Sequence, residues 1–271
     1  MRLMPHILAA LVAVILTGPA PAQQFDGRSA EDVVAVSLIG GWRMSETRHM
    51  AAIRIALAPG WKTYWRAPGE AGVPTVLTLR RAEGITGMAI HWPRPEVFFS
   101  NGMRSIGYRG DVILPVEFAV DRAGQIRVDG VLDLGVCHDV CMPISVDLAG
   151  LLPGTGTREP MIDRALSNRP LTASEAGAGT ARCRVEPIAD GLRVTVSAAM
   201  PDTGNDETLV IEHADPRIWV SEAATRRDGG MIQGTADIVP PHAGPFALQR
   251  ADLRITVIGT RMAVDLGACT G

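Results

Sequence analysis

The sequence is a succession of short apolar segments separated by clusters of glycine, proline, aspartate and asparagine. The 271 residues include 29 glycines and 19 prolines. No segment repeats its apolar residues with comparable strength at the period of a helix. Short segments rich in Val, Ile, Leu and Thr at this spacing are typical of β-sandwiches. We therefore expect an all-β protein.

The apolar segments fall into two groups. In the first half we expect strands at residues 33–38, 49–57, 75–79, 88–92, 112–120, 126–134 and 144–148. In the second half we expect them at residues 182–187, 192–198, 208–212, 218–220, 230–235, 253–258 and 262–266. These groups predict two β-sandwich domains, at residues 23–155 and 181–271.

The segment between the two groups, residues 156–180, is expected to be a linker. Residues 158–166 form a candidate short helix, because Pro160 suits the first turn. Residues 171–180 are small and polar, which is typical of a flexible connection. We expect a short helical or irregular linker.

The N-terminus resembles a secretory signal peptide, at residues 1–22. A basic start precedes an apolar run at residues 7–16, which is too short to span a bilayer. Ala20-Pro21-Ala22 then provides a small-x-small cleavage site. We expect export to the periplasm, where disulfides persist, and no membrane span in the mature chain. The formal net charge of -3 gives no indication of nucleic-acid binding.

Two of the four cysteines bracket the second expected domain. Cys183 lies at its beginning and Cys269 near the C-terminus. Exported domains are often closed by such bonds, so we expect a structural disulfide between them. The alternative is a second redox-active pair.

The other two cysteines, Cys137 and Cys141, lie close together with His138 and Asp139 between them. Four residues of extended strand span about 13 Å, whereas a disulfide needs Cα atoms roughly 4.4–6.8 Å apart. A bond between them therefore requires a tight turn, and Pro143 limits how the chain leaves it. A disulfide that closes so short a loop stabilises the fold only slightly. Such a bond is better suited to reversible exchange than to holding the fold together. A protonated His138 would favour a thiolate, and Asp139 would oppose it.

Two other readings of this segment stay open. One is a small structural bridge at a hairpin. The other is a Cu(I) site made by Cys137, Cys141, His138 and Met142, whose soft ligands suit that ion. The Cys-x-x-x-Cys-x-Pro arrangement also resembles copper chaperones of the Sco type, although those have a thioredoxin-like fold. A structural zinc site needs four ligands, and no second pair has suitable spacing. We expect no cofactor, with copper as the alternative.

Four ordered motifs carry a family resemblance, at residues 59–74, 91–95, 107–110 and 114–116. Together they resemble the N-terminal domain of DsbD-type thiol:disulfide interchange proteins, including the branch linked to copper tolerance. The resemblance covers roughly residues 30–150, and Cys137 and Cys141 fall where that family keeps its redox pair.

The resemblance implies an immunoglobulin-like β-sandwich and a thiol:disulfide oxidoreductase of the protein-disulfide reductase type. It implies that Cys137 and Cys141 are catalytic and cycle between dithiol and disulfide. Family members take electrons from a membrane-embedded domain and reduce periplasmic thioredoxin-fold partners. By family position, Cys141 is our preferred attacking thiol.

The resemblance also implies a cap loop that shields the pair. The matching residues here include Glu96, with Phe98 or Phe99 as the shield, and ordinary core packing is the alternative for both rings. Three aromatic residues of the first motif are expected in the core or the wall of the site: Trp61, Tyr64 and Trp65.

Two departures from the family pattern affect the expected function. Lys62, the single lysine of the chain, stands where this branch often has His. No membrane-embedded electron conduit and no thioredoxin-like domain follow in this sequence, so the electron donor is expected to be a separate protein. We expect a periplasmic thiol-disulfide exchange protein. The alternatives are a Cu(I)-binding copper-tolerance protein and a non-catalytic binding module with a structural disulfide.

Overall fold

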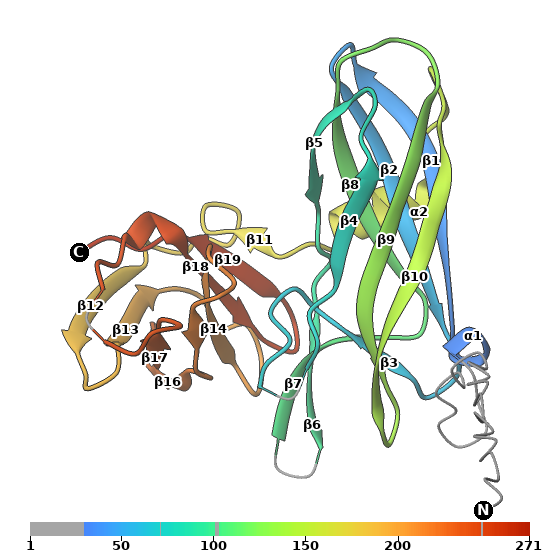
Figure 1. Cartoon of the computed structure of the whole chain (residues 1–271). Coiled ribbons are helices and arrows are strands. Elements are labelled where there is room, and N and C mark those ends of the chain that lie inside the picture. The colour runs from blue at the N-terminus through green and yellow to red at the C-terminus, as the bar shows by residue number, and fades with distance from the viewer. Residues whose placement is uncertain (1–29, 71, 101–102, 245) are drawn as a thin grey trace, which may run out of the picture.

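Two β-sandwiches follow one another along the chain in the computed structural model, which describes residues 30–70, 72–100, 103–244 and 246–271 (Figure 1). The all-β, immunoglobulin-like fold class is therefore confirmed. The expected signal peptide lies outside the described residues. Among those residues, no helix is both long enough and apolar enough to cross a membrane.

The first sandwich is built from two facing sheets. One sheet contains, in spatial order, β1 (Val34–Ser45), β2 (Arg48–Leu57), β8 (Val112–Val120) and β5 (Ile85–Ile90). The other contains, in spatial order, β10 (Cys141–Leu152), β9 (Ile126–Cys137), β3 (Lys62–Tyr64), β7 (Met103–Arg109) and β6 (Glu96–Ser100), with β4 (Val76–Arg81) also paired to β9.

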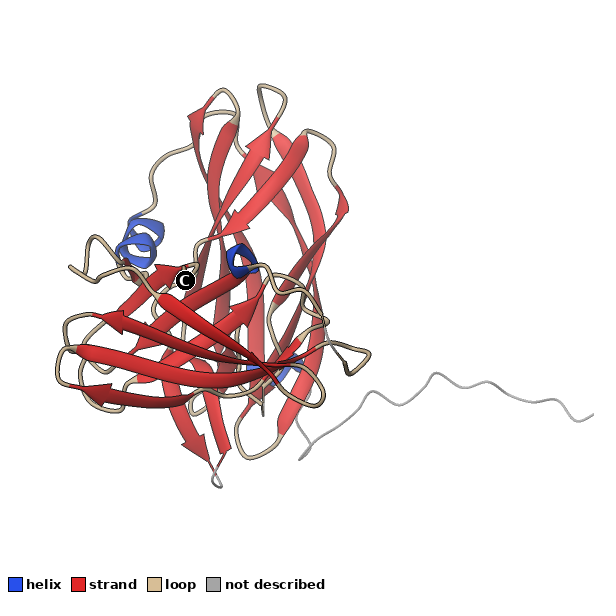
Figure 2. Cartoon of the chain, turned by 90° about the vertical axis from the view of Figure 1, so that its left-hand side faces the viewer, coloured by secondary structure: helices blue, strands red, loops and turns tan. Residues whose placement is uncertain are grey.

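The second sandwich has the same two-layer design (Figure 2). One sheet contains β11 (Leu171–Thr172), β19 (Ala263–Gly267), β18 (Leu253–Ile258) and β14 (Thr208–His213). The other contains β12 (Arg182–Pro187), β13 (Leu192–Ala199), β17 (Met231–Val239) and β15 (Trp219–Val220), with β16 (Ala224–Asp228) also on β17.

Helices are few and short in the described residues. They are α1 (Ala30–Val33), α2 (Pro160–Ser167) and the 3₁₀ turn η1 (Arg250–Asp252). Helix α2 is the expected short helix, and Pro160 stands in its first turn. Within the expected linker, Leu171 and Thr172 form β11 and pair in parallel with Val264 and Asp265 of β19. Two residues give too short a periodic pattern to be recognised as a strand.

Strand β9 shows why the first sandwich forms. Alternate residues from Ile126 to Val136 are buried in the core, as a strand with one inward face requires. The alternation breaks at its end, where Gly135 and Cys137 are buried as well. Those two residues face outward, so other parts of the chain must cover the outer face at this place.

The second sandwich lies beside the lower part of the first, next to β7 (Figure 1). Arg66 makes a two-pronged ion pair with Glu212, with N–O distances of 2.8 and 2.9 Å. Arg104 pairs with Glu222 at 3.1 Å. Ile258 of the second sandwich belongs to the core of the first. Two largely buried ion pairs and shared apolar contacts therefore join the two sandwiches.

The structure joins Cys183 and Cys269 by a disulfide, with Cα atoms 5.7 Å apart and a sequence separation of 86. Closing so long a loop removes much of the entropy of the unfolded chain. Cys183→Ala/Cys269→Ala should therefore lower the free energy of unfolding of the second sandwich by about 4–5 kcal/mol. Urea unfolding followed by hydrogen exchange in strands β12 to β19 measures this.

The matched control removes the other disulfide, whose sequence separation is 4. Cys137→Ala/Cys141→Ala should cost the first sandwich only about 2 kcal/mol by the same chain-entropy relation. Equal losses for the two variants would contradict the assignment of Cys183–Cys269 as the structural bond.

Candidate active site

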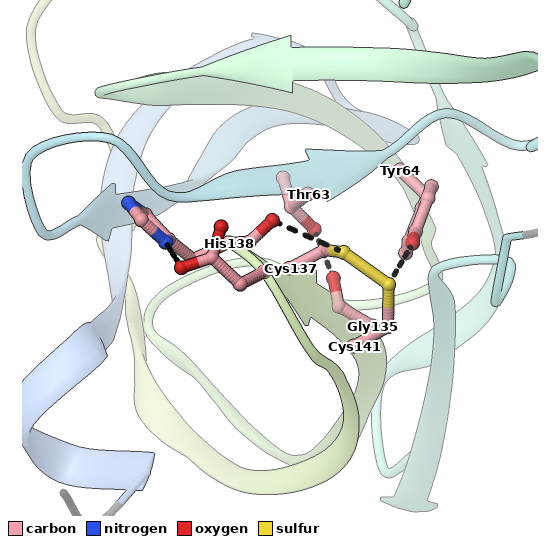
Figure 3. The surroundings of a disulfide bond; sticks show 7 residues. Thr63, Tyr64, Gly135, Cys137, His138 and Cys141 are labelled. Atoms are coloured by element: carbon pink, nitrogen blue, oxygen red, sulfur yellow. Dashed lines mark hydrogen bonds and ion pairs between the residues drawn. A yellow bond between two sulfur atoms is a disulfide. The ribbon is translucent and has the colours of Figure 1, made fainter. Parts of the chain in front are cut away.

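Cys137 ends strand β9 and Cys141 begins strand β10, so a three-residue turn lies between them. The two residues are direct partners across the hairpin, and the Cα–Cα distance is 4.1 Å. They form a disulfide. The expected tight turn is therefore a β-hairpin, and the bond lies at its tip (Figure 3).

The two sulfur-bearing residues differ in exposure. Cys137 is 8% exposed, whereas Cys141 is an exposed residue. A thiolate from another molecule can therefore approach Cys141 more readily than Cys137. Attack by a thiolate requires access to the sulfur, so the exposed residue is the natural point of entry.

Tyr64 covers the disulfide from strand β3. Its hydroxyl donates a hydrogen bond to Cys141 Sγ at 3.0 Å (Figure 3). Burial raises the pKa of this hydroxyl above its ordinary value, so it stays protonated and able to donate at neutral pH. A donor at this position favours a thiolate over a thiol on Cys141.

Gly135 makes room for the Tyr64 ring. A Cβ atom at position 135 would lie 2.7 Å from two carbons of that ring and 2.9 Å from Val73 Cβ. Contacts this short do not occur, so only glycine fits beneath the ring. The Thr63 hydroxyl also donates to the Gly135 carbonyl at 2.8 Å, which ties β3 to β9 on the inner side.

Four residues form a row across this sheet: Cys141, Cys137, Lys62 and Arg109 are consecutive partners on β10, β9, β3 and β7. Directly paired residues point to the same face of a sheet, and their Cβ atoms lie about 4.5–5.5 Å apart. Both basic side chains therefore emerge on the face that carries the disulfide. We call these four residues the disulfide row.

Phe98 of strand β6 lies against the two cations of the disulfide row. The Lys62 ammonium is 5.2 Å from the centre of its ring, and the Arg109 guanidinium carbon is 4.5 Å from it. Such distances allow cation–π attraction. Phe98 is 4% exposed, whereas Phe99 is 69% exposed. The ring that shares the face of the disulfide is therefore that of Phe98, and its role as a shield stays a prediction.

The other expected cap residue, Glu96, lies beside Arg109. Its carboxylate is 3.6 Å from the Arg109 guanidinium, and both side chains are more than half exposed. This carboxylate therefore offsets the charge of Arg109, at the far end of the disulfide row.

The residues inside the hairpin turn point outward. His138 Nδ1 is 2.8 Å from an Asp139 carboxylate oxygen, and its ring lies 5.8 Å from the ring of Trp61. Pro143 is exposed on β10. The Asp139 carboxylate would offset the charge of a protonated His138, which weakens the influence of that histidine on the sulfurs.

Met142 is buried, and it packs in the core of the first sandwich. It follows Cys141 directly on a strand, so its side chain points to the opposite face. The structure therefore separates this thioether from the sulfurs. No group of three or more His, Cys, Asp or Glu residues in the described part of the chain is placed to hold a metal ion. The copper alternative stays a prediction, but in this structure Met142 does not lie on the face of the sulfurs.

The aromatic residues around β3 divide by face. Trp61 and Trp65 are buried in the core, 8% and 0% exposed, and they alternate with Lys62 and Tyr64 on the outer face. Both expected locations are therefore occupied, the core by the two tryptophans and the wall of the site by the tyrosine.

Two features of the site could not be found from the sequence. The pairing of Lys62 with Cys137 joins residues far apart in the chain and depends on the register of β3 against β9. The contact of Gly135 with Tyr64 depends on the same register. The sequence does place a single lysine in the first motif, which is the one available indication.

Comparisons with known proteins agree with this architecture. The family model described as thiol:disulfide interchange protein DsbD, N-terminal, matches residues 31–153. Among solved structures, the N-terminal periplasmic domain of ScsB from Proteus mirabilis is similar, with a TM-score of 0.65 and 21% identity over 92% of this chain and 97% of that one. At that identity the likeness shows the fold. A search of curated proteins finds no match.

Gly135→Ala should lower the free energy of unfolding by about 1–3 kcal/mol, because the new methyl group collides with the Tyr64 ring. Gly87→Ala is the matched control, since its Cβ would meet only Ala119 Cβ, at 3.7 Å. Urea unfolding of both variants measures the difference.

A double-mutant cycle tests whether Tyr64 is the cause. In a Tyr64→Ala background, Gly135→Ala should cost less, with a coupling of at least about 0.5 kcal/mol. An equal cost in both backgrounds would show that the ring does not occupy this place.

Proposed function

Residues 31–153 form a DsbD N-terminal-type domain, and from this we propose that the chain is a periplasmic thiol-disulfide exchange protein acting through Cys137 and Cys141. The observation that carries the proposal is the position of the disulfide in that domain. It lies at the exposed tip of a hairpin, with one sulfur-bearing residue exposed and the other buried. The partners would be a membrane-embedded electron donor and thioredoxin-fold proteins of the same compartment.

The chemistry would proceed in two exchanges. A partner thiolate attacks Cys141 Sγ, a mixed disulfide forms, and the electron pair of the broken bond leaves with Cys137 Sγ as a thiolate. A second thiolate of the partner then attacks the partner sulfur that is bonded to Cys141, and Cys141 Sγ leaves as a thiolate. Two electrons pass to this protein, and the partner dithiol becomes a disulfide. The reverse sequence would reduce a partner disulfide.

A purely structural role for the Cys137–Cys141 bond is less well supported. Strands β9 and β10 pair along their whole lengths, from Cys137↔Cys141 to Ile126↔Leu152. This ladder already closes the hairpin, so the disulfide adds little constraint to it. Breaking the bond leaves the scaffold in place, as repeated exchange requires.

Single-cysteine variants test the proposal directly. Cys137→Ala leaves Cys141 as a lone exposed thiol, and Cys141→Ala leaves Cys137 as a lone buried one. A thioredoxin with one active-site cysteine, activated as a mixed disulfide with thionitrobenzoate, serves as the probe. We expect Cys137→Ala to form the protein–protein disulfide at least about tenfold faster, because exchange requires access to the sulfur.

Equal and slow reaction of both variants with the activated thioredoxin would overturn the proposed exchange. The same variants treated with a small activated disulfide provide the control, because both thiols should then react. Trapping with periplasmic extract would follow and identify the natural partner.

The order in which the two disulfides are reduced supplies a second prediction. Cys137–Cys141 closes a short loop and Cys183–Cys269 a long one, with sequence separations of 4 and 86. The short-loop bond should therefore be reduced first as reduced glutathione is raised. Differential alkylation followed by peptide mapping shows the order. Greater resistance of Cys137–Cys141 would favour the structural reading.

A further inference from the structure

The disulfide row places a lysine directly beside the buried cysteine. Lys62 and Cys137 are partners across β3 and β9, while Cys141 lies on the far side of Cys137. Lys62 is half-buried, and it is the single lysine of the chain. We propose that Lys62 is a tuning residue of the exchange reaction, whose ammonium stabilises the thiolate that forms on Cys137 when the disulfide opens.

This inference rests on the proposed function and adds a residue to it. When a partner thiolate attacks Cys141 Sγ, the sulfur–sulfur bond breaks and its electron pair remains on Cys137 Sγ. That sulfur is the leaving group, and a leaving group with a lower pKa departs faster. A neighbouring cation lowers the pKa of a thiol, because it favours the charged form.

The charges around Cys137 make Lys62 the effective cation. On the far side of Lys62, Arg109 is also in the row, but Glu96 lies 3.6 Å from it and offsets its charge. On the hairpin turn, His138 is paired with the Asp139 carboxylate. The Tyr64 hydroxyl donates to Cys141 Sγ.

Phe98, on β6 beyond β7, and the half-buried position of Lys62 hold the lysine side chain against the outer face of this sheet. The ammonium rests 5.2 Å from the centre of the Phe98 ring, which limits its freedom to move into solvent. Partial removal from water lowers the local screening of its charge. The two cysteines therefore have different partners, with the lysine beside Cys137 and the tyrosine hydroxyl on Cys141.

The first experiment titrates each cysteine separately. In a Cys141→Ala background, Cys137 is the single free thiol, and its thiolate absorbance is followed against pH. Lys62→Met should decrease the ionisation constant of the Cys137 thiol about threefold to tenfold, which raises its pKa. Lys62→Arg should restore most of the effect. Arg81→Met is the control, because Arg81 lies on β4 in the same sheet, paired with Asp129 at the far part of β9.

The same substitutions in a Cys137→Ala background report on Cys141. The effect of Lys62→Met should be smaller there, because Cys141 is one strand farther from the lysine. An unchanged Cys137 titration in Lys62→Met would overturn the inference, as would an equal change in Arg81→Met.

The second experiment measures the rate at which the disulfide is reduced, which depends on Cys137 as the leaving group. Dithiothreitol should reduce the intact Cys137–Cys141 bond about threefold to tenfold more slowly in Lys62→Met than in the unaltered protein at neutral pH. Dithiothreitol needs no protein partner. An unchanged rate would overturn the role of Lys62 while leaving the proposed exchange intact. Failure of the unaltered protein to exchange with activated thioredoxin would remove the proposed function itself.

A third measurement avoids substitution and remains valid if Lys62→Met folds poorly. Reductive methylation with ¹³C-formaldehyde labels the one lysine and the α-amino group. The lysine methyl resonance should shift when the disulfide is reduced above neutral pH, and the α-amino resonance should not. A lysine resonance that is the same in both redox states would overturn the inference.

Discussion

Strand β9 is the element on which both the first sandwich and its disulfide depend. One of its edges pairs with β10 along the whole hairpin, and the other edge is shared between β4 and β3. Its inward residues build the core, while Gly135 and Cys137 face outward at its end. A slip of one residue would exchange the two faces. The burial of Val136 and Leu134 therefore fixes the position of the sulfur as firmly as it fixes the core.

The segment that follows Trp61 connects this strand to the rest of the molecule. Its outward residues have three different tasks, because Lys62 lies beside Cys137, Tyr64 binds Cys141 and Arg66 pairs with Glu212 of the second sandwich. Its inward residues pack in the core. One short extended segment thus contacts the core, the disulfide and the second sandwich.

The sequence predicted the parts of the structure that depend on local pattern. Long alternating segments such as residues 112–120 were recognised as strands, and the spacing of Cys137 and Cys141 required a turn. Strands β3, β6 and β7 were not recognised. Strand β3 has three residues, too few for a periodic pattern, β6 coincides with the expected cap loop, and β7 overlaps the motif at residues 107–110. Their pairing depends on contacts between distant residues, which a single sequence does not display.

The sequence identified several residues of the site, but it did not show how their side chains are arranged around the disulfide. The family motif supplied Tyr64, and the cysteines were identified from their spacing alone. Which aromatic ring shares the face of the sulfurs depended on the alternation in β6, where Phe98 is buried and Phe99 is exposed. The contribution of Gly135 could not be predicted, because it consists of the space that the residue leaves for the Tyr64 ring.

The hairpin holds its two strands in register without depending on the disulfide, so the bond can have a fixed position and still be open to exchange. A bond that held the fold together would cost stability at each opening. Here the backbone ladder and the core side chains Val136 and Met142 hold the two strands in register. In the proposed exchange, opening the bond would leave thiolates on Cys141 and Cys137 on an intact pair of strands. If the ladder and the core keep the two strands in register, the free-energy difference between the two redox states would depend on the local charges and hydrogen bonds at the sulfurs.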